Sequence, residues 1–142
     1  MKPLFSNKKF NLNYFQIETY EAGIELKGNE VKSIVANEAN IDEAFGIIKN
    51  DEVFIINMYV HPYVNANTFQ TIDPVRRRKL LLHRTQIKKI QGKIKRDRLI
   101  LVPTKVYLDK NHIKVEIALA KHKKAPDKRE DIKKRDLSRE KN

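Results

Sequence analysis

The densest group of side chains able to bind a ligand lies between Val75 and Arg98. This stretch holds eleven lysines and arginines against a single acid, Asp97. Both cations bind phosphate oxygens, and arginine can do so through two hydrogen bonds at once. One carboxylate cannot neutralise eleven cations, so the pattern predicts contacts with a polyanion; a solvated helix face remains an alternative for Lys93 to Arg98. The cations are Arg76, Arg77, Arg78, Lys79, Arg84, Lys88, Lys89, Lys93, Lys95, Arg96 and Arg98.

Three consecutive leucines, Leu80 to Leu82, stand among these cations. The ordinary role of each leucine is to fill the core. If the segment is a strand, however, alternation turns at least one of them outward. An exposed apolar side chain among cations is suited to packing on an unstacked base.

The residues that usually catalyse reactions form no coherent set. The acids Glu18, Glu21, Glu25 and Glu30 have no nucleophile or histidine placed beside them, and we expect each to be a surface charge. The sequence contains no cysteine, no serine nucleophile motif and no glycine-rich phosphate loop. We therefore predict no catalytic residue, no cofactor and no metal site, and hence no enzyme. The histidines are too scattered for a zinc site: His61, His83, His112 and His122.

The last 22 residues, Lys121 to Asn142, hold ten basic and five acidic side chains. Their few apolar side chains cannot form a core, so we expect this segment to be disordered until a polyanionic partner binds it. The preceding segment, Ile113 to Ala120, alternates like a strand. The sequence thus predicts a folded body over residues 1–120 and a basic tail over residues 121–142.

Length and charge agree with that division. A chain of 142 residues supports one domain, and the body carries +7 of the formal net charge of +12. A basic excess in both parts favours nucleic acid as the partner. No apolar run is long enough for a signal peptide or a membrane span, so we expect a soluble, cytoplasmic protein with no membrane partner.

The first half of the body contains a long β-patterned segment and a short helix. Tyr14 to Lys27 is rich in aromatic and β-branched residues and predicts one bent strand or a tight pair, with a bulge or bend at Gly23. Asn29 is a suitable N-cap for a helix whose apolar positions are Val31, Ile34 and Val35. We expect this helix to end at Asn37 or Asn40.

Two hairpins frame the second half. Strands at Ala44–Lys49 and Glu52–Val60 are joined by Asn50-Asp51, and strands at Leu99–Leu108 and His112–Ala120 by residues 109–111.

Between these hairpins lie a loop and a helix. Residues 61–74 predict a long surface loop. From Arg84 to Arg98, the spacing of Ile87, Ile90 and Ile94 predicts a helix with one buried face.

The elements add up to about six strands and two or three short helices, without β-α-β alternation. The fold class is therefore mainly β, and the best match is a small antiparallel barrel of the oligonucleotide-binding type with a basic C-terminal tail. A small sandwich is the structural alternative.

Five segments in order give the chain a close resemblance to the SmpB family, the tmRNA-binding proteins of bacterial trans-translation. They are Asn7-Lys8-Lys9, Tyr20-Glu21-Ala22-Gly23, Gly28-Asn-Glu-Val-Lys-Ser33, Asp73-Pro74 followed by Arg78-Lys-Leu-Leu-Leu-His83, and Ala118-Leu-Ala-Lys-x-Lys-Lys-x-x-Asp-Lys-Arg129. The resemblance runs from Asn7 to about Arg135. It implies an oligonucleotide-binding barrel that grips the tRNA-like domain of tmRNA and, carried with elongation factor Tu, enters stalled ribosomes.

The resemblance also implies site residues. Asn7, Glu21 and Leu81 match family positions associated with tmRNA binding, and their chemistry suits RNA: an amide, an acceptor for base or ribose donors, and an apolar surface for a base or sugar. With the basic residues around them, we predict RNA contacts at Asn7, Lys8, Lys9, Glu21, Lys32, Arg76, Arg78, Lys79 and Leu81.

The resemblance further implies that the tail contacts small-subunit rRNA in the empty mRNA channel, beyond the decoding centre. The matching residues are Lys121, Lys123, Lys124, Asp127, Lys128 and Arg129. Asp127 to Glu130 has the spacing of a capping box, so we expect a helix from Lys128 to Lys141 when the tail is bound to the ribosome. Two positions differ from the family: His122 replaces a glycine, and Pro126 replaces a ring that would stack on rRNA.

Two other classes of protein are compatible with a basic chain of this size. A structural ribosomal protein would also be basic with a tail, but it would copurify with every ribosome. A small RNA-cleaving or RNA-modifying enzyme would need an acid, a base or a metal site. An adaptor for ribosome rescue accounts for the motifs and the tail together.

Overall fold

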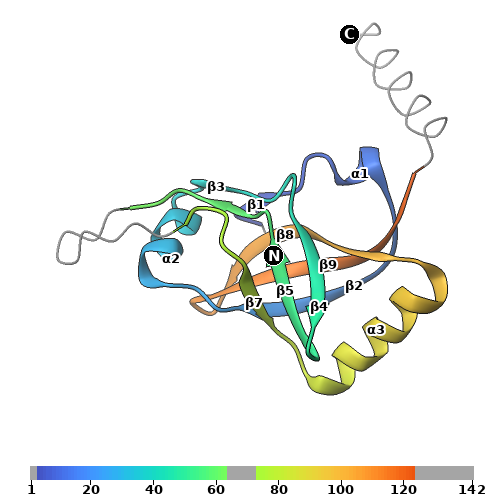
Figure 1. Cartoon of the computed structure of the whole chain (residues 1–142). Coiled ribbons are helices and arrows are strands. Elements are labelled where there is room, and N and C mark those ends of the chain that lie inside the picture. The colour runs from blue at the N-terminus through green and yellow to red at the C-terminus, as the bar shows by residue number, and fades with distance from the viewer. Residues whose placement is uncertain (1–2, 64–72, 124–142) are drawn as a thin grey trace, which may run out of the picture.

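The computed structural model describes residues 3–63 and 73–123. They form a seven-stranded antiparallel sheet, a two-stranded sheet and three helices (Figure 1). The strands are β1 (Phe5–Ser6), β2 (Tyr14–Ile24), β3 (Ala39–Asn40), β4 (Phe45–Lys49), β5 (Glu52–Ile56), β6 (Tyr59–Val60), β7 (Arg78–Leu81), β8 (Ile100–Asp109) and β9 (His112–His122). The helices are α1 (Phe10–Asn13), α2 (Gly28–Val35) and α3 (Arg84–Asp97).

The six longer strands pair in a ring. Along the large sheet the order is β1-β8-β4-β5-β7-β2-β9, and β9 pairs in turn with β8. The register between β4 and β8 has a single pair, Gly46 opposite Leu101. Figure 1 shows β2, β8 and β9 as long curved strands, with α2 and α3 at opposite ends of the sheet in this view. The mainly β, antiparallel fold class predicted from the sequence is confirmed.

Residues with positive φ make both predicted hairpin turns. Asn50 and Asp51 have φ of 53° and 61°, and Lys110 and Asn111 have φ of 48° and 67°. Two successive positive φ values suit the right-handed twist of the flanking strands, which is why Asn and Asp are favoured there. The β4–β5 and β8–β9 hairpins are confirmed.

The start of α2 differs from the prediction. The helix begins at Gly28 and its N-cap is Lys27, whose backbone N–H donates to Oε1 of Glu30 at 2.9 Å. Asn29 is therefore inside the helix, and its proposed capping role is wrong. The end of α2 is close to the expected end at Asn37 or Asn40, because Asn37 has a φ of 61° just after the last turn.

Several strand features also differ from those predicted. The irregularity in β2 lies between Gln16 and Glu18 instead of at Gly23. The predicted strand Glu52–Val60 is two strands, interrupted near Asn57, whose φ is 60°. Strand β9 continues through His122, so the folded body extends past the predicted boundary at Ala120. Residues 64–72 of the predicted loop lie outside the described residues.

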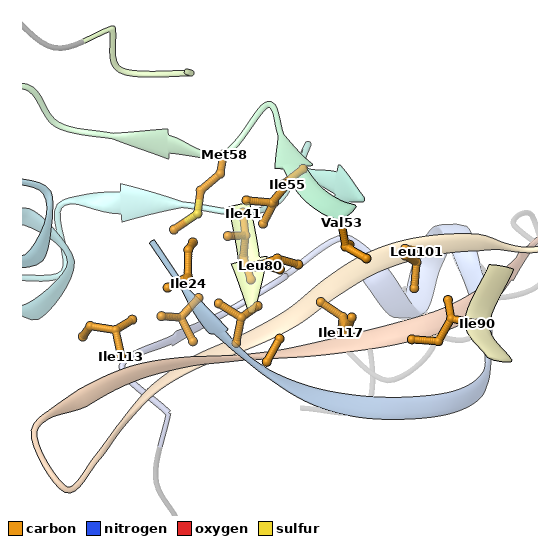
Figure 2. Packing of buried hydrophobic residues seen from close by; sticks show 14 of the residues in the cluster. Ile24, Ile41, Val53, Ile55, Met58, Leu80, Ile90, Leu101, Ile113 and Ile117 are labelled. Atoms are coloured by element: carbon orange, nitrogen blue, oxygen red, sulfur yellow. The ribbon is translucent and has the colours of Figure 1, made fainter. Parts of the chain in front are cut away.

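The core fills the space enclosed by the long strands. Figure 2 shows Ile24, Leu80 and Ile117 pointing toward one another from β2, β7 and β9. Ile90 of α3 packs into the same cluster, as its helical spacing predicted. Burying these side chains is the main favourable term in folding, and it sets which residues remain on the surface.

Candidate nucleic-acid interface

A hollow of about 810 Å³ lies where β2, β7, the β4–β5 turn and the start of α3 meet. It is lined by three residues that the sequence analysis selected, Glu21, Lys79 and Leu81. The pairing of β2 with β7 and β9 brings them together, because Gly23 lies opposite both Leu81 and Lys114. We call this hollow, lined also by Asn50, Asp51, Glu52, Leu82, His83, Arg84, Gln86, Ile87 and Lys114, the Leu81 groove.

Leu81 is the outward-facing member of the leucine triplet. Its side chain is 49% exposed, whereas Leu80 is 1% exposed. A second, smaller hollow, lined by Ile24, Leu26 and Val31 among others, lies on the other side of Leu81. A Cβ on Gly23 would sit 3.4 Å from the Leu81 side chain, in ordinary van der Waals contact, so Gly23 and Leu81 lie directly against each other. The prediction that one leucine turns outward is confirmed.

Glu21 is exposed at the edge of the groove and is held by a tyrosine of β8, the strand beyond its partner β9. The hydroxyl of Tyr107 on β8 donates to Oε2 of Glu21. Burial and this hydrogen bond to Glu21 raise the pKa of Tyr107, so the phenol remains the donor at neutral pH. A carboxylate accepts several hydrogen bonds, so Glu21 keeps capacity for a ribose hydroxyl or a base amine.

Sequence reasoning missed Lys114, which lines the groove, and Tyr107, which donates to Glu21. Tyr107 and Lys114 lie opposite each other across the β8–β9 hairpin. The predicted three-residue turn at 109–111 would have placed Ile113 opposite Tyr107, whereas the actual turn residues are Lys110 and Asn111. Lys114 adds a cation beside Glu21.

The buried acid Glu30 pairs with two arginines at the start of the basic stretch, Arg76 and Arg78. Arg78 is completely buried, and its Nε donates to Oε2 of Glu30 at 2.6 Å. Arg76 donates to both oxygens of the same carboxylate, at 3.0 and 2.5 Å. Arg78 also donates to the carbonyls of Met58 and Pro74, at 2.8 and 3.3 Å.

This network corrects two predictions. The side chain of Arg78 has no surface to offer RNA, so its predicted phosphate contact does not hold in this fold. Glu30, expected to be a surface charge, is 2% exposed. Burial acts to raise the pKa of Glu30, but hydrogen bonds from Arg76, the Lys27 backbone and Arg78 outweigh it, and the net effect is a lowered pKa.

Other cations of the stretch also have partners, most of them from distant strands. Lys79 lies 3.6 Å from Glu52, Lys93 pairs with Glu18, and Arg96 lies 3.0 Å from its neighbour Asp97. Arg77 lies over the ring of Phe54, 4.6 Å from its centre. Within the described residues, the cations of the stretch that remain without a carboxylate partner are Arg77, Arg84, Lys88, Lys89, Lys95 and Arg98.

The N-terminal site residues lie outside the Leu81 groove. Asn7 donates to the carbonyl of Pro103 and accepts from the backbone of Lys9, both at 3.0 Å, so its amide ties the N-terminal segment to β8. Lys9 pairs with Glu43. Lys8 and Lys9 each line a shallow hollow of their own. The structure therefore does not bring these residues together with Glu21.

Lys32 on α2 lies over an aromatic ring. Its Nζ is 4.7 Å from the centre of the Tyr63 ring, and the ring of His61 meets Tyr63 edge-on at 5.0 Å. The hydroxyl of Ser33 holds the carbonyl of His61 at 2.6 Å. The rings therefore have a fixed position beside Lys32, away from the Leu81 groove.

The first residues of the predicted tail belong to the folded body. Lys121 pairs with Phe15, and the His122 ring lies 4.8 Å from that of Tyr14. Lys123 donates through its backbone to Asn13 at 2.9 Å and through Nζ to the carbonyl of Asn11 at 2.7 Å. The other predicted tail contacts, Lys124, Asp127, Lys128 and Arg129, and the predicted helix from Lys128 to Lys141 lie outside the described residues.

Residues 3–63 and 73–123 offer neither a metal site nor a membrane-spanning helix. No group of histidine and carboxylate side chains there is arranged to hold a metal ion. No helix in that part of the chain is long and apolar enough to cross a membrane. The interface chemistry that the described residues offer is a carboxylate and an exposed leucine with cations around them.

Comparison with protein families gives one match across the chain. The model of the family described as SmpB protein matches residues 4–142.

Individual relatives agree with the family match. A protein of Malacoplasma penetrans named SsrA-binding protein is 54% identical over 140 residues, which cover 99% of this chain and 95% of that protein. A protein of the same name from Caldanaerobacter subterraneus subsp. tengcongensis is 49% identical over 140 residues, covering 99% and 88%.

A solved structure has a similar fold. It is described as "tmRNA-SmpB: a journey to the center of the bacterial ribosome" and superposes with a TM-score of 0.70 at 38% sequence identity. The match covers 87% of each chain. The likeness therefore extends over nearly all of the described barrel.

Proposed function

Since the chain belongs to the SmpB family, we propose that it is an RNA-binding adaptor of trans-translation. In this role it binds the tRNA-like domain of tmRNA and promotes its entry into stalled ribosomes. The ribosome is rescued, and the unfinished peptide is tagged for degradation. Its partners are tmRNA and the ribosome, with elongation factor Tu reached through the tmRNA complex, so its place of action is the cytoplasm.

The observation that carries this proposal is the pairing of Glu21 and Leu81 in one groove. A carboxylate that accepts directional hydrogen bonds and an exposed leucine able to pack on a base recognise features that phosphates alone do not provide. Lys79 and Lys114 at the same groove supply general attraction to the backbone. The groove can therefore select one RNA shape, whereas a purely basic patch would bind many.

Binding and recognition need no catalytic step. Glu21 and Leu81 act by contact, and the chemistry of peptide transfer belongs to the ribosome and the tmRNA. We accordingly assign no catalytic residue, cofactor or metal, and classify the chain as a binding protein.

The body and the tail have separate tasks in this proposal. The barrel, which includes β9 through His122, grips the tRNA-like domain. The tail occupies the empty mRNA channel, where its cations meet rRNA phosphates. This division is supported by the composition of residues 124–142 and by the position of Lys121 to Lys123 at the end of β9.

The test is to recover the protein from growing bacteria with its bound RNA and to sequence that RNA. We expect one tmRNA species to dominate after ribosomes are removed at high magnesium. If the protein were instead recovered at one copy per ribosome without tmRNA enrichment, it would be a structural ribosomal protein. A variant with Glu21→Gln and Leu81→Ala together serves as the matched control and should lose the enrichment.

A further inference from the structure

One face of α3 carries a line of cations that leads away from the Leu81 groove. Arg84 lines the groove, and Lys88 and Lys95 follow four and eleven residues later. At 100° per residue, the three side chains leave the helix within about 40° of one another and span about 16 Å along its axis. All three are exposed, and within the described part of the chain none has a carboxylate partner.

The remaining cations of α3 are arranged differently. Lys93 pairs with Glu18, and Arg96 pairs with Asp97. Lys89 points about 120° away from the line, toward the side of the helix on which Glu18 lies. The acids that form ion pairs with α3, Glu18 and Asp97, therefore leave the line of Arg84, Lys88 and Lys95 unpaired within the described residues.

Such a line is unfavourable for the helix alone. Arg84 and Lys88 are like charges one turn apart, a spacing that destabilises a helix. No contact inside the described molecule compensates for it. An external anion, by contrast, would be bound by all three side chains at once.

Gly92 gives a second, independent indication. It lies in the interior of α3, one turn after Lys88 and three residues before Lys95, and is exposed. A Cβ at this position would meet nothing within 4 Å, and its φ is not positive. A glycine there weakens the helix relative to alanine, and nothing within the fold requires one. A glycine does permit an outside group to approach the helix backbone closely.

We propose that the sugar-phosphate backbone of the RNA in the Leu81 groove continues along α3. Its phosphates bind Arg84, Lys88 and Lys95, and the strand comes closest to the helix at Gly92. This inference rests on the proposed function, because RNA in the groove is its premise. It extends that function by assigning a second contact surface, which reads no base and holds the RNA in register.

The first experiment measures the salt dependence of binding to the isolated tRNA-like domain of tmRNA. Lys88→Gln and Lys95→Gln should each weaken binding severalfold and flatten the plot of log K against log salt by roughly 0.7 to 0.9. Lys89→Gln is the matched control on the same helix and should leave affinity and slope near those of the wild type. If all three variants behave alike, the line is a solvated face and the inference is wrong.

The second experiment separates binding from stability at Gly92. Gly92→Ala should raise the melting temperature by about 2–4 °C, because alanine favours the helix. The same change should weaken RNA binding, and Gly92→Gln should weaken it further in proportion to its bulk. If both variants bound RNA as tightly as the wild type, the close approach of the RNA strand to the helix at Gly92 would be overturned.

Binding to isolated small ribosomal subunits distinguishes the two possible sources of RNA. Loss of affinity of the α3 variants for the tRNA-like domain supports the continuous strand proposed here. If the variants lost affinity only for the small subunit, that continuity would be overturned, and the cations of α3 would be assigned to rRNA. Wild-type protein that failed to bind the tRNA-like domain would refute the proposed function itself, a result distinct from failure of the α3 variants alone.

Discussion

Arg78 lies wholly inside the fold, with its Nε 2.6 Å from Oε2 of Glu30, 48 residues earlier in the chain. This pair joins the first turn of α2 to β7, the strand that carries Lys79 and Leu81 into the groove. The adjacent carbonyls of Met58 and Pro74 accept from the same guanidinium. An arginine that the sequence predicted to contact RNA is thus part of the frame behind the interface.

Removing the carboxylate should unfold the protein more readily. Glu30→Ala leaves Arg78 buried without its charge partner, and we expect a loss of about 3–5 kcal/mol in the free energy of unfolding, measured by urea denaturation. The matched control is Glu18→Ala, which removes a partly exposed pair with Lys93 and should cost about 1 kcal/mol. Equal effects of the two substitutions would show that burial does not decide the outcome.

Acid should weaken the fold through the same carboxylate. The pKa of Glu30 lies below its ordinary value of 4.5, so the unfolded chain takes up this proton first as pH falls. The stabilisation is complete above about pH 4.5 and is lost as pH drops through the lowered pKa of the folded state. Melting temperatures between about pH 5 and pH 3 should therefore fall more steeply for the wild type than for Glu30→Gln. Parallel curves would count against this assignment.

Selectivity for RNA should depend on Glu21. Glu21→Gln replaces an acceptor-only group at the groove, and the lost directional contact should reduce affinity for the tRNA-like domain of tmRNA by about 1–3 kcal/mol. Affinity for a generic RNA duplex of equal length should change little, because phosphate contacts are sequence-independent. Glu25→Gln, an exposed acid that does not line the groove, is the control and should bind both RNAs like the wild type.

The single pair that joins β4 to β8 should be sensitive to added volume. A Cβ on Gly46 would lie 2.8 Å from Cβ of Leu101, closer than side chains pack. Gly46→Ala should therefore lower the free energy of unfolding by about 1–3 kcal/mol in urea denaturation. Gly28→Ala, at a position with nothing within 4 Å, should leave stability unchanged or slightly raised. A neutral effect of Gly46→Ala would mean that the two strands separate easily.

Deleting Asp127 to Asn142 should separate recognition of tmRNA from its accommodation in the stalled ribosome. Because the Leu81 groove lies in the body, the truncated protein should bind the tRNA-like domain nearly as tightly as the full chain. Peptide tagging on stalled ribosomes, measured in a reconstituted translation system, should be abolished because the mRNA channel stays empty. Normal tagging, or a collapse of tmRNA affinity, would contradict the proposed division between body and tail.

Local sequence was sufficient to predict the longer elements. The two hairpins follow from turn residues that tolerate positive φ, and α3 follows from the spacing of Ile87 and Ile90. Both signals act over a few neighbouring residues, so they are readable without the fold. The strands β1, β3 and β6 are two residues long and carry no period, so only their partners define them.

The charge pattern shows what only the tertiary structure decided. Sequence identified the cations from Arg76 to Arg98 and counted one acid among them, whereas the fold brings Glu18, Glu30 and Glu52 to four of those cations from other elements. Coulomb interactions depend on distance in space and on burial, and neither quantity is set by separation along the chain. The sequence alone thus determined that the chain is a basic β protein of the SmpB type. The fold decided that Arg78 is structural, and it placed Glu21, Lys79 and Leu81 in one groove because strand register carries distant residues to a common face.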